Sequence, residues 1–146
     1  MSLHSLPDFT LMNALAAIFI AIVFIILGSL FKEPKRQNFM AIMIGGAGAA
    51  YLNGGLGYWE FAFCALITFL AYKGLKRYYY IGIGWLLHAG WDILHHLFAN
   101  PIVPFSPSSS AGCAVTDTIL AVWFFFHAPS VFDLFNKYKT QPLKIN

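Results

Sequence analysis

The stretch LMNALAAIFIAIVFIILGSLFKEPKR, residues 11–36, decides the fold class. Residues 11–31 are almost wholly apolar, and an α-helix needs roughly 20 such residues to cross the hydrocarbon core of a bilayer. The residues that follow carry positive charge on Lys32, Lys35 and Arg36. Because Lys and Arg near the end of a span mark the cytoplasmic face, we expect a membrane-spanning helix that ends in the cytoplasm.

The same pattern continues along the chain, with further apolar runs at about 38–52, 58–75, 79–99 and 111–128. The other Lys and Arg residues follow the third and fifth runs: Lys73, Lys76, Arg77, Lys137, Lys139 and Lys144. The segments expected on the opposite side, residues 1–10, 53–57 and 100–112, contain neither residue type. The sequence therefore predicts an all-α integral membrane bundle of five transmembrane helices, one domain over residues 1–146. Its N-terminus is expected outside and its C-terminus in the cytoplasm, where the amphipathic tail 130–146 lies on the membrane surface.

Composition supports this fold class and limits the functions available. The chain of 146 residues is 59% hydrophobic and 10% charged, whereas soluble domains carry roughly 25% charged residues. The net charge of +3 does not indicate nucleic acid, because the positive residues act as topological anchors. We expect an integral protein of the plasma or inner membrane, with membrane lipids as partners. Residues 11–31 should be retained, because no basic region of a cleaved signal peptide precedes them.

The second apolar run is rich in small residues. Ala41, Gly45, Ala49 and Asn53 recur at every fourth position, which gives one helix face small enough for close packing. This face predicts tight contact with a neighbouring helix and offers a route to a homo-oligomer.

Three carboxylates, Glu60, Asp92 and Asp117, fall inside the expected spans, while the one Lys or Arg within their bounds, Lys73, lies at a cytoplasmic end. An ionised carboxylate in hydrocarbon is costly and is normally paired or functional. Compensation must come from histidine, from a proton or from a bound cation. At about 1.5 Å per residue, all three acids belong to the outer half of the bundle, with Asn53 nearby. His127 lies roughly 15 Å deeper than Asp117 and is not expected in this cluster.

The fourth span brings histidines to these acids. His88, Asp92 and His95 are spaced i, i+4, i+7, so they share one helix face, with His96 at its margin. Imidazole nitrogens and carboxylate oxygens are ligands that Zn²⁺ and other divalent transition metals accept. We predict a divalent metal, zinc first, bound by His88, Asp92, His95 and Asp117. Asp117 is expected either to bind the metal or to orient one of its ligands. It is expected to act in catalysis together with Glu60, which is the general base on metal-bound water.

The stretch WLLHAGWDILHH, residues 85–96, taken with Asp117 and His127, resembles short multi-pass membrane proteins grouped as a family of unknown function. This resemblance covers most of the chain and implies no activity. The His-x3-Asp portion also resembles one motif of intramembrane CAAX-protease-like proteins, and the site is similar to the zinc sites of alkaline-ceramidase-like hydrolases. The first group has a paired-glutamate motif where this chain has Glu60 alone, and the second has seven spans. The likeness is therefore one of site chemistry.

These observations favour a metal-dependent membrane hydrolase that acts on a lipid or another amphiphile from the outer leaflet. The alternatives are a small ion or proton transporter that uses the same residues, a structural polar network, or a non-enzymatic scaffold. The inner halves of the second and third spans offer only Thr68 as a polar step, which argues against a path through the membrane. Haem ligation is disfavoured because the outer histidines share one helix.

Overall fold

The computed structural model describes residues 6–53 and 55–140, and these are helical with no strand among them. The elements are α1 (Leu11–Ser29), α2 (Lys35–Ala49), the short 3-10 helix η1 (Ala50–Asn53), α3 (Trp59–Gly74), α4 (Tyr78–Leu97), α5 (Ser109–Phe125) and α6 (Val131–Thr140). The predicted all-α class is confirmed. Each helix begins and ends within a few residues of an apolar run or of the tail predicted from the sequence.

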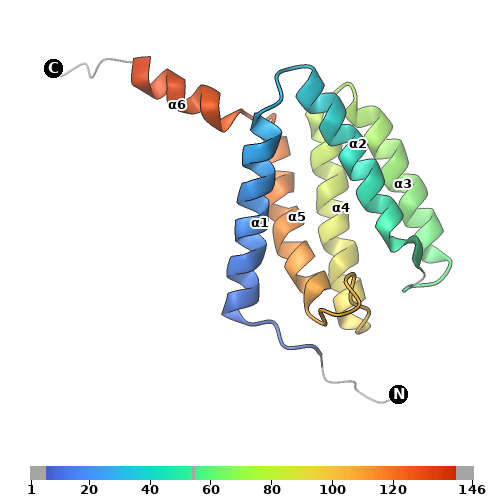
Figure 1. Cartoon of the computed structure of the whole chain (residues 1–146). Helices are drawn as coiled ribbons and strands as arrows, with labels where there is room; N and C mark the ends of the chain where they lie inside the picture. The colour runs from blue at the N-terminus through green and yellow to red at the C-terminus, as the bar shows by residue number, and fades with distance from the viewer. Residues whose placement is uncertain (1–5, 54, 141–146) are drawn as a thin grey trace.

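Helices α1 to α5 run up and down beside one another, and α6 leaves the bundle at one end (Figure 1). Helices α4 and α5 pack together in the middle; α1 lies against α5, and α2 and α3 pair on the other side against α4. The connections α1–α2, α3–α4 and α5–α6 meet at one end, and α2–α3 and α4–α5 meet at the other. Consecutive helices from α1 to α5 are therefore antiparallel.

Local sequence explains where the helices begin and end. Thr10 caps α1, because its hydroxyl accepts a hydrogen bond from the Asn13 N–H while Asn13 Oδ1 accepts one from the Thr10 N–H. Pro34 stands directly before α2, where its missing N–H costs no helical hydrogen bond. After α5, His127 and Ala128 take left-handed backbone angles, φ 64° and 46°, which stop the helix and direct α6 away from the bundle.

The apolar core lies between α2, α3, α4 and α5. Its largest fully buried apolar side chains are Met40, Ile44, Ile67, Ile81, Leu120 and Phe124. Small residues of α2 allow α3 to approach: a Cβ added at Gly48 would lie 2.9 Å from Ile67 Cγ2. Of the face predicted for the second apolar run, Ala41 is buried and a Cβ at Gly45 would lie 3.4 Å from Ala71 Cβ, whereas Ala49 is exposed. Gly46 has open space around it.

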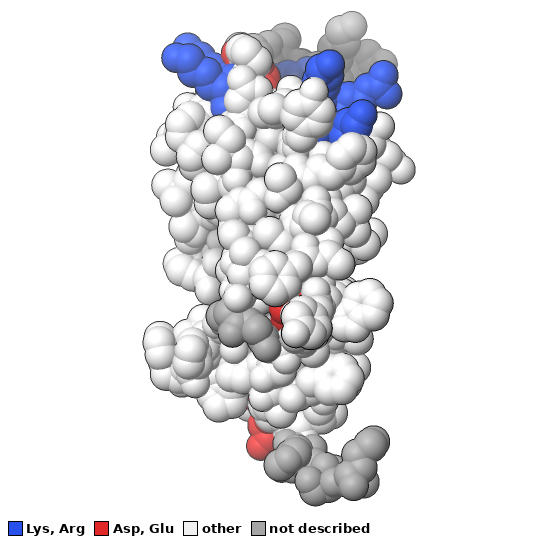
Figure 2. All heavy atoms as spheres, turned by 90° about the vertical axis from the view of Figure 1, so that its right-hand side faces the viewer, with Lys and Arg blue, Asp and Glu red and all other residues white. Residues whose placement is uncertain are grey.

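The outer surface is apolar over most of its length and charged at one end. In Figure 2 the Lys and Arg residues gather at the end where α6 leaves, and the broad middle of that face carries none. Large side chains such as Met12, Phe19, Phe61 and Phe126 are more than half exposed. Of the helices described, α1 is the one that is both long and apolar enough to cross a membrane, with 19 residues and a mean hydropathy of 2.7.

Candidate functional site

A cluster of buried polar side chains interrupts the apolar interior. Glu60 of α3, Asp117 of α5 and the α4 residues His88, Asp92 and His95 are each at most 6% exposed. The α4 residues lie on one face because of their i, i+4, i+7 spacing, and that face is turned into the bundle. The residues selected from the sequence are therefore buried together. Their hydrogen-bond partners indicate what the cluster can do.

An inner network links His88 to both aspartates through Tyr51. The Tyr51 hydroxyl donates a hydrogen bond to Asp92 Oδ1 at 2.6 Å and lies 3.2 Å from His88 Nδ1. Asp92 and Asp117 are within hydrogen-bond reach of each other. Two carboxyl groups can share a hydrogen bond only when one of them carries a proton. The inner network is thus a chain of four buried groups. A direct bond between the two acids would need a shared proton or a cation, and Asp92 Oδ2 has no other hydrogen-bond partner.

An outer network is built around Glu60. This carboxylate accepts hydrogen bonds from Trp91 Nε1 at 2.8 Å and from the Leu56 N–H at 2.7 Å. His95 Nε2 lies 3.0 Å from Glu60 Oε1, an ion-pair distance, although the two atoms are not aligned as a hydrogen bond. His95 Nδ1 lies 3.3 Å from the Asn100 carbonyl oxygen. Both ring nitrogens of His95 therefore face protein groups.

Tyr51 and Trp91 are the members that the sequence analysis did not select. The Tyr51 ring lies between the two histidines, with centroid distances of 5.3 Å to His88 and 5.2 Å to His95. Trp91 stacks on Phe63 at 4.4 Å and points its N–H at Glu60. The available signal for Tyr51 was that it is the one Tyr in the Ala- and Gly-rich run 38–52, where a buried hydroxyl needs a polar partner from another helix.

Two loops close over the outer network. A Cβ at Gly55 would lie 2.6 Å from His95 Cε1, so the α2–α3 turn approaches this ring as only glycine permits. The Asn100 side chain donates to the Gly55 carbonyl at 2.8 Å, and the Ser110 hydroxyl donates to the Asn100 carbonyl at 3.0 Å. The α4–α5 loop is thereby joined to the α2–α3 turn above His95.

Asp117 connects the inner network to an open groove of about 310 Å³ between α1, α5 and the α4–α5 loop. Polar groups along this groove include Asn13, Ser108 and Thr116. Asn13 Nδ2 donates to the Ser108 hydroxyl at 3.1 Å, which ties α1 to the loop at the mouth of the groove. A ligand in this groove would meet Asp117 first and the rest of the inner network through it.

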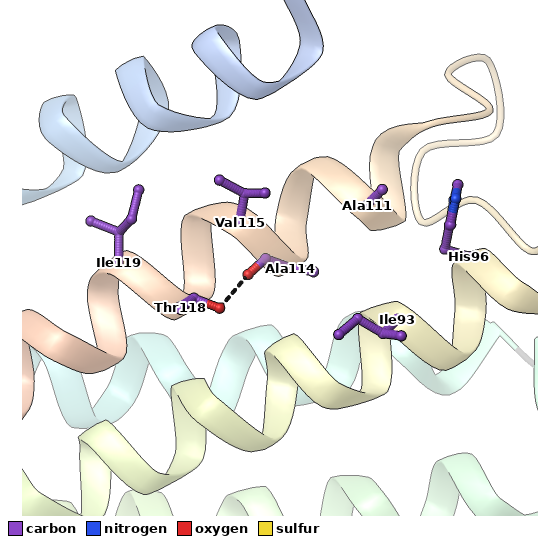
Figure 3. Close-up of a pocket in the computed structure, with 7 residues that line it drawn as sticks. All are labelled: Ile93, His96, Ala111, Ala114, Val115, Thr118 and Ile119. Atoms are coloured by element: carbon purple, nitrogen blue, oxygen red, sulfur yellow. Dashed lines mark hydrogen bonds between the residues drawn. The ribbon is translucent and has the colours of Figure 1, made fainter. Parts of the chain in front are cut away.

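The remaining predicted residues lie outside both networks. His96 borders a separate groove of about 420 Å³ between α4 and α5, whose other lining residues are Ile93, Ala111, Ala114, Val115, Thr118 and Ile119 (Figure 3). Its Nδ1 is buried without a hydrogen-bond partner. The Asn53 side chain is outside the part of the chain that the structure describes. His127 is exposed at the end of α5, away from the cluster.

The predicted metal ligands divide between the two networks. Among the residues described, no group of three or more His, Cys, Asp or Glu side chains is arranged to hold a metal ion. His88 Nδ1 faces the Tyr51 hydroxyl and His88 Nε2 is buried without a hydrogen-bond partner, while His95 faces Glu60 and Asn100. A cation between Asp92 and Asp117 would meet two carboxylates. Of these, Asp92 has its Oδ2 buried without a hydrogen-bond partner.

The fold and the site define a small all-helical protein with a buried acid and histidine cluster. The chain belongs to a family of unknown function, DUF6010, whose profile matches residues 12–130. The match contains every residue of both networks, in keeping with the resemblance noted from residues 85–96. Comparison with curated proteins found no match, and neither did comparison with solved structures.

Proposed function

We propose that α1 to α5 cross a membrane, with the Lys- and Arg-rich end and α6 on the cytoplasmic side. The charge distribution and the apolar outer surface support this placement. The 15 residues of α2 are short for a span, but η1 extends it by 4 residues. The 16 residues of α3 call for local thinning of the bilayer or tilt of its neighbours. A homo-oligomer through α2 would use Gly46 and Ala49, which remain exposed.

Within this bundle the inner network is a hydrolytic site for an amphiphile that enters from the outer leaflet. The observation that supports this activity is the groove that ends at Asp117, whose carboxyl group pairs with Asp92 behind it. An ionised carboxylate beside a protonated carboxyl group can act first as base and then, once protonated, as acid in the same reaction. The substrate class is an ester or amide of a lipid, because the groove is largely apolar and bordered by a few hydroxyl and amide groups.

The reaction consumes one water molecule. Asp117, at the groove, removes a proton from water as its oxygen bonds to the substrate carbonyl carbon. The bond from that carbon to the leaving oxygen or nitrogen then breaks, and the leaving group takes that same proton back from Asp117, which borders the groove, while Asp92 behind it keeps the proton that the pair shares. Tyr51 holds Asp92 in place, and His88 fixes the Tyr51 hydroxyl. Glu60, with donors on both oxygens, is better suited to position His95 and Trp91 than to act as a base.

A divalent cation, zinc first, is the alternative to the shared proton in this proposal. It would bind between Asp92 and Asp117 and supply the acidity that activates water. Metal analysis of the purified protein separates the two versions. Metal bound in stoichiometric amount by the native protein but not by Asp92→Asn supports the cation, whereas its absence together with activity that survives chelation supports the shared proton.

The activity itself is tested with protein reconstituted into vesicles that contain a ceramide, a diacylglycerol and a phospholipid. Mass spectrometry of the lipids before and after incubation measures hydrolysis. We expect one lipid class to be cleaved by the native protein and by Asp8→Asn, an exposed acid outside both networks and outside the groove lining. Asp117→Asn should abolish cleavage. Equal products from Asp117→Asn and the native protein would refute the assignment.

A proton relay is the second candidate, favoured by the continuous chain from His88 through Tyr51 and Asp92 to Asp117. Fully buried Ile44, Ile81, Leu120 and Phe124 lie between this chain and the Lys-rich end, which opposes passage through the bundle. A pH-sensitive dye inside reconstituted vesicles measures proton flux and decides between the relay and hydrolysis. Proton flux lost in Asp92→Asn would favour the relay over hydrolysis.

A further inference from the structure

A polar hollow of about 450 Å³ lies at the Lys- and Arg-rich end, away from the acid and histidine cluster. It is formed where α1 ends, α2 begins and α6 begins, and its polar lining residues are Ser29, Lys32, Glu33, Arg36, Ser130 and Asp133. The Ser130 hydroxyl donates to the Ser29 carbonyl at 3.2 Å, and the Val131 N–H donates to the Ser29 hydroxyl at 3.2 Å. These contacts hold the start of α6 against the end of α1, so the hollow has fixed walls.

Arg36 is unusual among the basic residues because it is only 5% exposed. Its Nε donates to Glu33 Oε1 at 2.9 Å, and the nearby Tyr78 hydroxyl donates to the same oxygen at 2.7 Å. Nη1 of Arg36 is buried without a hydrogen-bond partner. A buried guanidinium N–H group without a hydrogen-bond acceptor costs free energy. An oxyanion such as phosphate is the ligand that guanidinium groups bind best.

An apolar groove of about 370 Å³ continues from this hollow between α1 and α2. The two share Leu30 and Phe31, and the groove is lined further by Phe24, Leu27, Gly28, Phe39, Met40 and Met43. From Leu30 back to Phe24 the helix rises by about 9 Å, so the groove runs from the charged end toward the middle of the bundle. A polar hollow that opens into an apolar groove has the form of a phospholipid, with a headgroup and the first part of an acyl chain.

The charges of the hollow have both signs. Lys32 and Arg36 are positive, and Glu33 and Asp133 are negative. Glu33 already accepts from Arg36 and Tyr78, which leaves Lys32 and the free Arg36 N–H for an anion and Asp133 for a cation. A headgroup with a phosphate and an ammonium meets both requirements, whereas an anionic headgroup would leave Asp133 beside negative charge.

We propose that this hollow and its groove bind a phospholipid of the cytoplasmic leaflet whose headgroup carries both a phosphate and an ammonium, such as phosphatidylethanolamine. The phosphate lies between Lys32 and Arg36, the ammonium faces Asp133, and one acyl chain follows the groove between α1 and α2. The proposal rests on the membrane placement given above and is independent of the proposed hydrolysis. Its consequence is that α6 docks onto a bound lipid as well as onto α1.

Native mass spectrometry of the full chain in mild detergent tests the proposal, with phosphatidylethanolamine, phosphatidylglycerol, diacylglycerol and inorganic phosphate as separate probes. We expect phosphatidylethanolamine to be retained more strongly than the other three. Lys32→Ala should weaken its retention about tenfold, the loss expected for one charge-assisted hydrogen bond. Lys35→Ala, which removes an exposed charge outside the hollow, should have no effect. Arg36→Lys keeps the buried charge and serves as a second variant if Arg36→Ala does not fold.

The acyl-chain part has its own pair of variants. Leu27→Trp fills the apolar groove and should reduce retention, whereas Phe19→Trp, on an exposed part of α1 outside the groove, should not. Asp92→Asn should bind the lipid normally, so a failed hydrolase proposal would leave this result intact. Equal retention of phosphatidylglycerol, strong binding of inorganic phosphate alone, or indifference to both Lys32→Ala and Leu27→Trp would each overturn the lipid site.

Discussion

At the scale of single residues, Tyr51 joins groups that the sequence places far apart. Its hydroxyl contacts Asp92 and His88, and its ring lies between His88 and His95. Without Tyr51, the Asp92 carboxyl group would have only Asp117 as a side-chain partner. The proposed hydrolysis depends on Asp92 and Asp117, but their arrangement depends on this phenol.

Tyr51→Phe should therefore destabilise the protein while leaving the shape of the site almost unchanged. The substitution removes one hydroxyl and leaves Asp92 Oδ1 buried with no donor from η1, at an expected cost of about 1–3 kcal/mol in the free energy of unfolding. Chemical unfolding in detergent micelles, followed by circular dichroism, measures this loss. Tyr79→Phe is the control, because Tyr79 is 58% exposed. Equal stability of the two variants would mean that the Tyr51 hydroxyl contributes nothing.

The residues of the site were only partly predictable. His88, Asp92 and His95 could be found because an i, i+4, i+7 stripe fixes a common helix face, and charge in an apolar run marks them. Their partners could not, since spacing along one helix does not say which neighbouring side chain each residue meets. Glu60 pairs with His95 because the α2–α3 turn passes close to that ring at Gly55, a tertiary approach that no local pattern encodes.

At the scale of elements, the helix ends were predictable because charges, Gly and Pro separate the apolar runs. The order in which the helices pack was not. Helix α5 lies between α1 and α4, so a groove between the first and the fifth helix reaches Asp117. The sequence places Asp117 at the right depth, but the groove arises from the contact between α1 and α5, the first and the last helix of the bundle.

Gly48 is the glycine of α2 that makes the tightest contact with α3. A Cβ at Gly48 would lie 2.9 Å from Ile67 Cγ2 and 3.0 Å from its Cβ, and Ile67 is fully buried. Gly48→Ala should therefore cost about 1–3 kcal/mol through overpacking. Gly46→Ala, two residues away with open space around it, should be neutral or stabilising by up to about 1 kcal/mol because alanine favours the helix. Unfolding midpoints in the same detergent compare the two; a stable Gly48→Ala variant would contradict this packing.

At the scale of the whole molecule, charge is separated along the bundle axis. The Lys and Arg residues in Figure 2 lie at the end where α6 leaves. Glu60 and Asp92 are buried in the halves of α3 and α4 toward the opposite end, and Asp117 is buried at the middle of α5. An ordinary water-soluble helical protein would spread charge over its surface and would not expose Phe19, Phe61 or Phe126. This asymmetry is the reason that we favour five spans although α1 alone meets the criteria of length and hydropathy.

The proposed orientation gives a direct prediction from single-cysteine variants of a chain in which Cys64 and Cys113 are replaced by alanine. Phe105→Cys lies in the α4–α5 loop at a residue that is 89% exposed, and Lys76→Cys lies in the α3–α4 connection at the basic end. In intact cells a membrane-impermeant maleimide should label Phe105→Cys and should label Lys76→Cys only after the membrane is permeabilised. Helix α4 is the helix between Lys76 and Phe105 in the chain, so these two positions lie on opposite sides of the membrane only if α4 crosses the bilayer. Labelling of both positions from the outside would therefore exclude α4 as a span. Since α4 supplies His88, Asp92 and His95, that result would also remove the membrane setting from the proposed site.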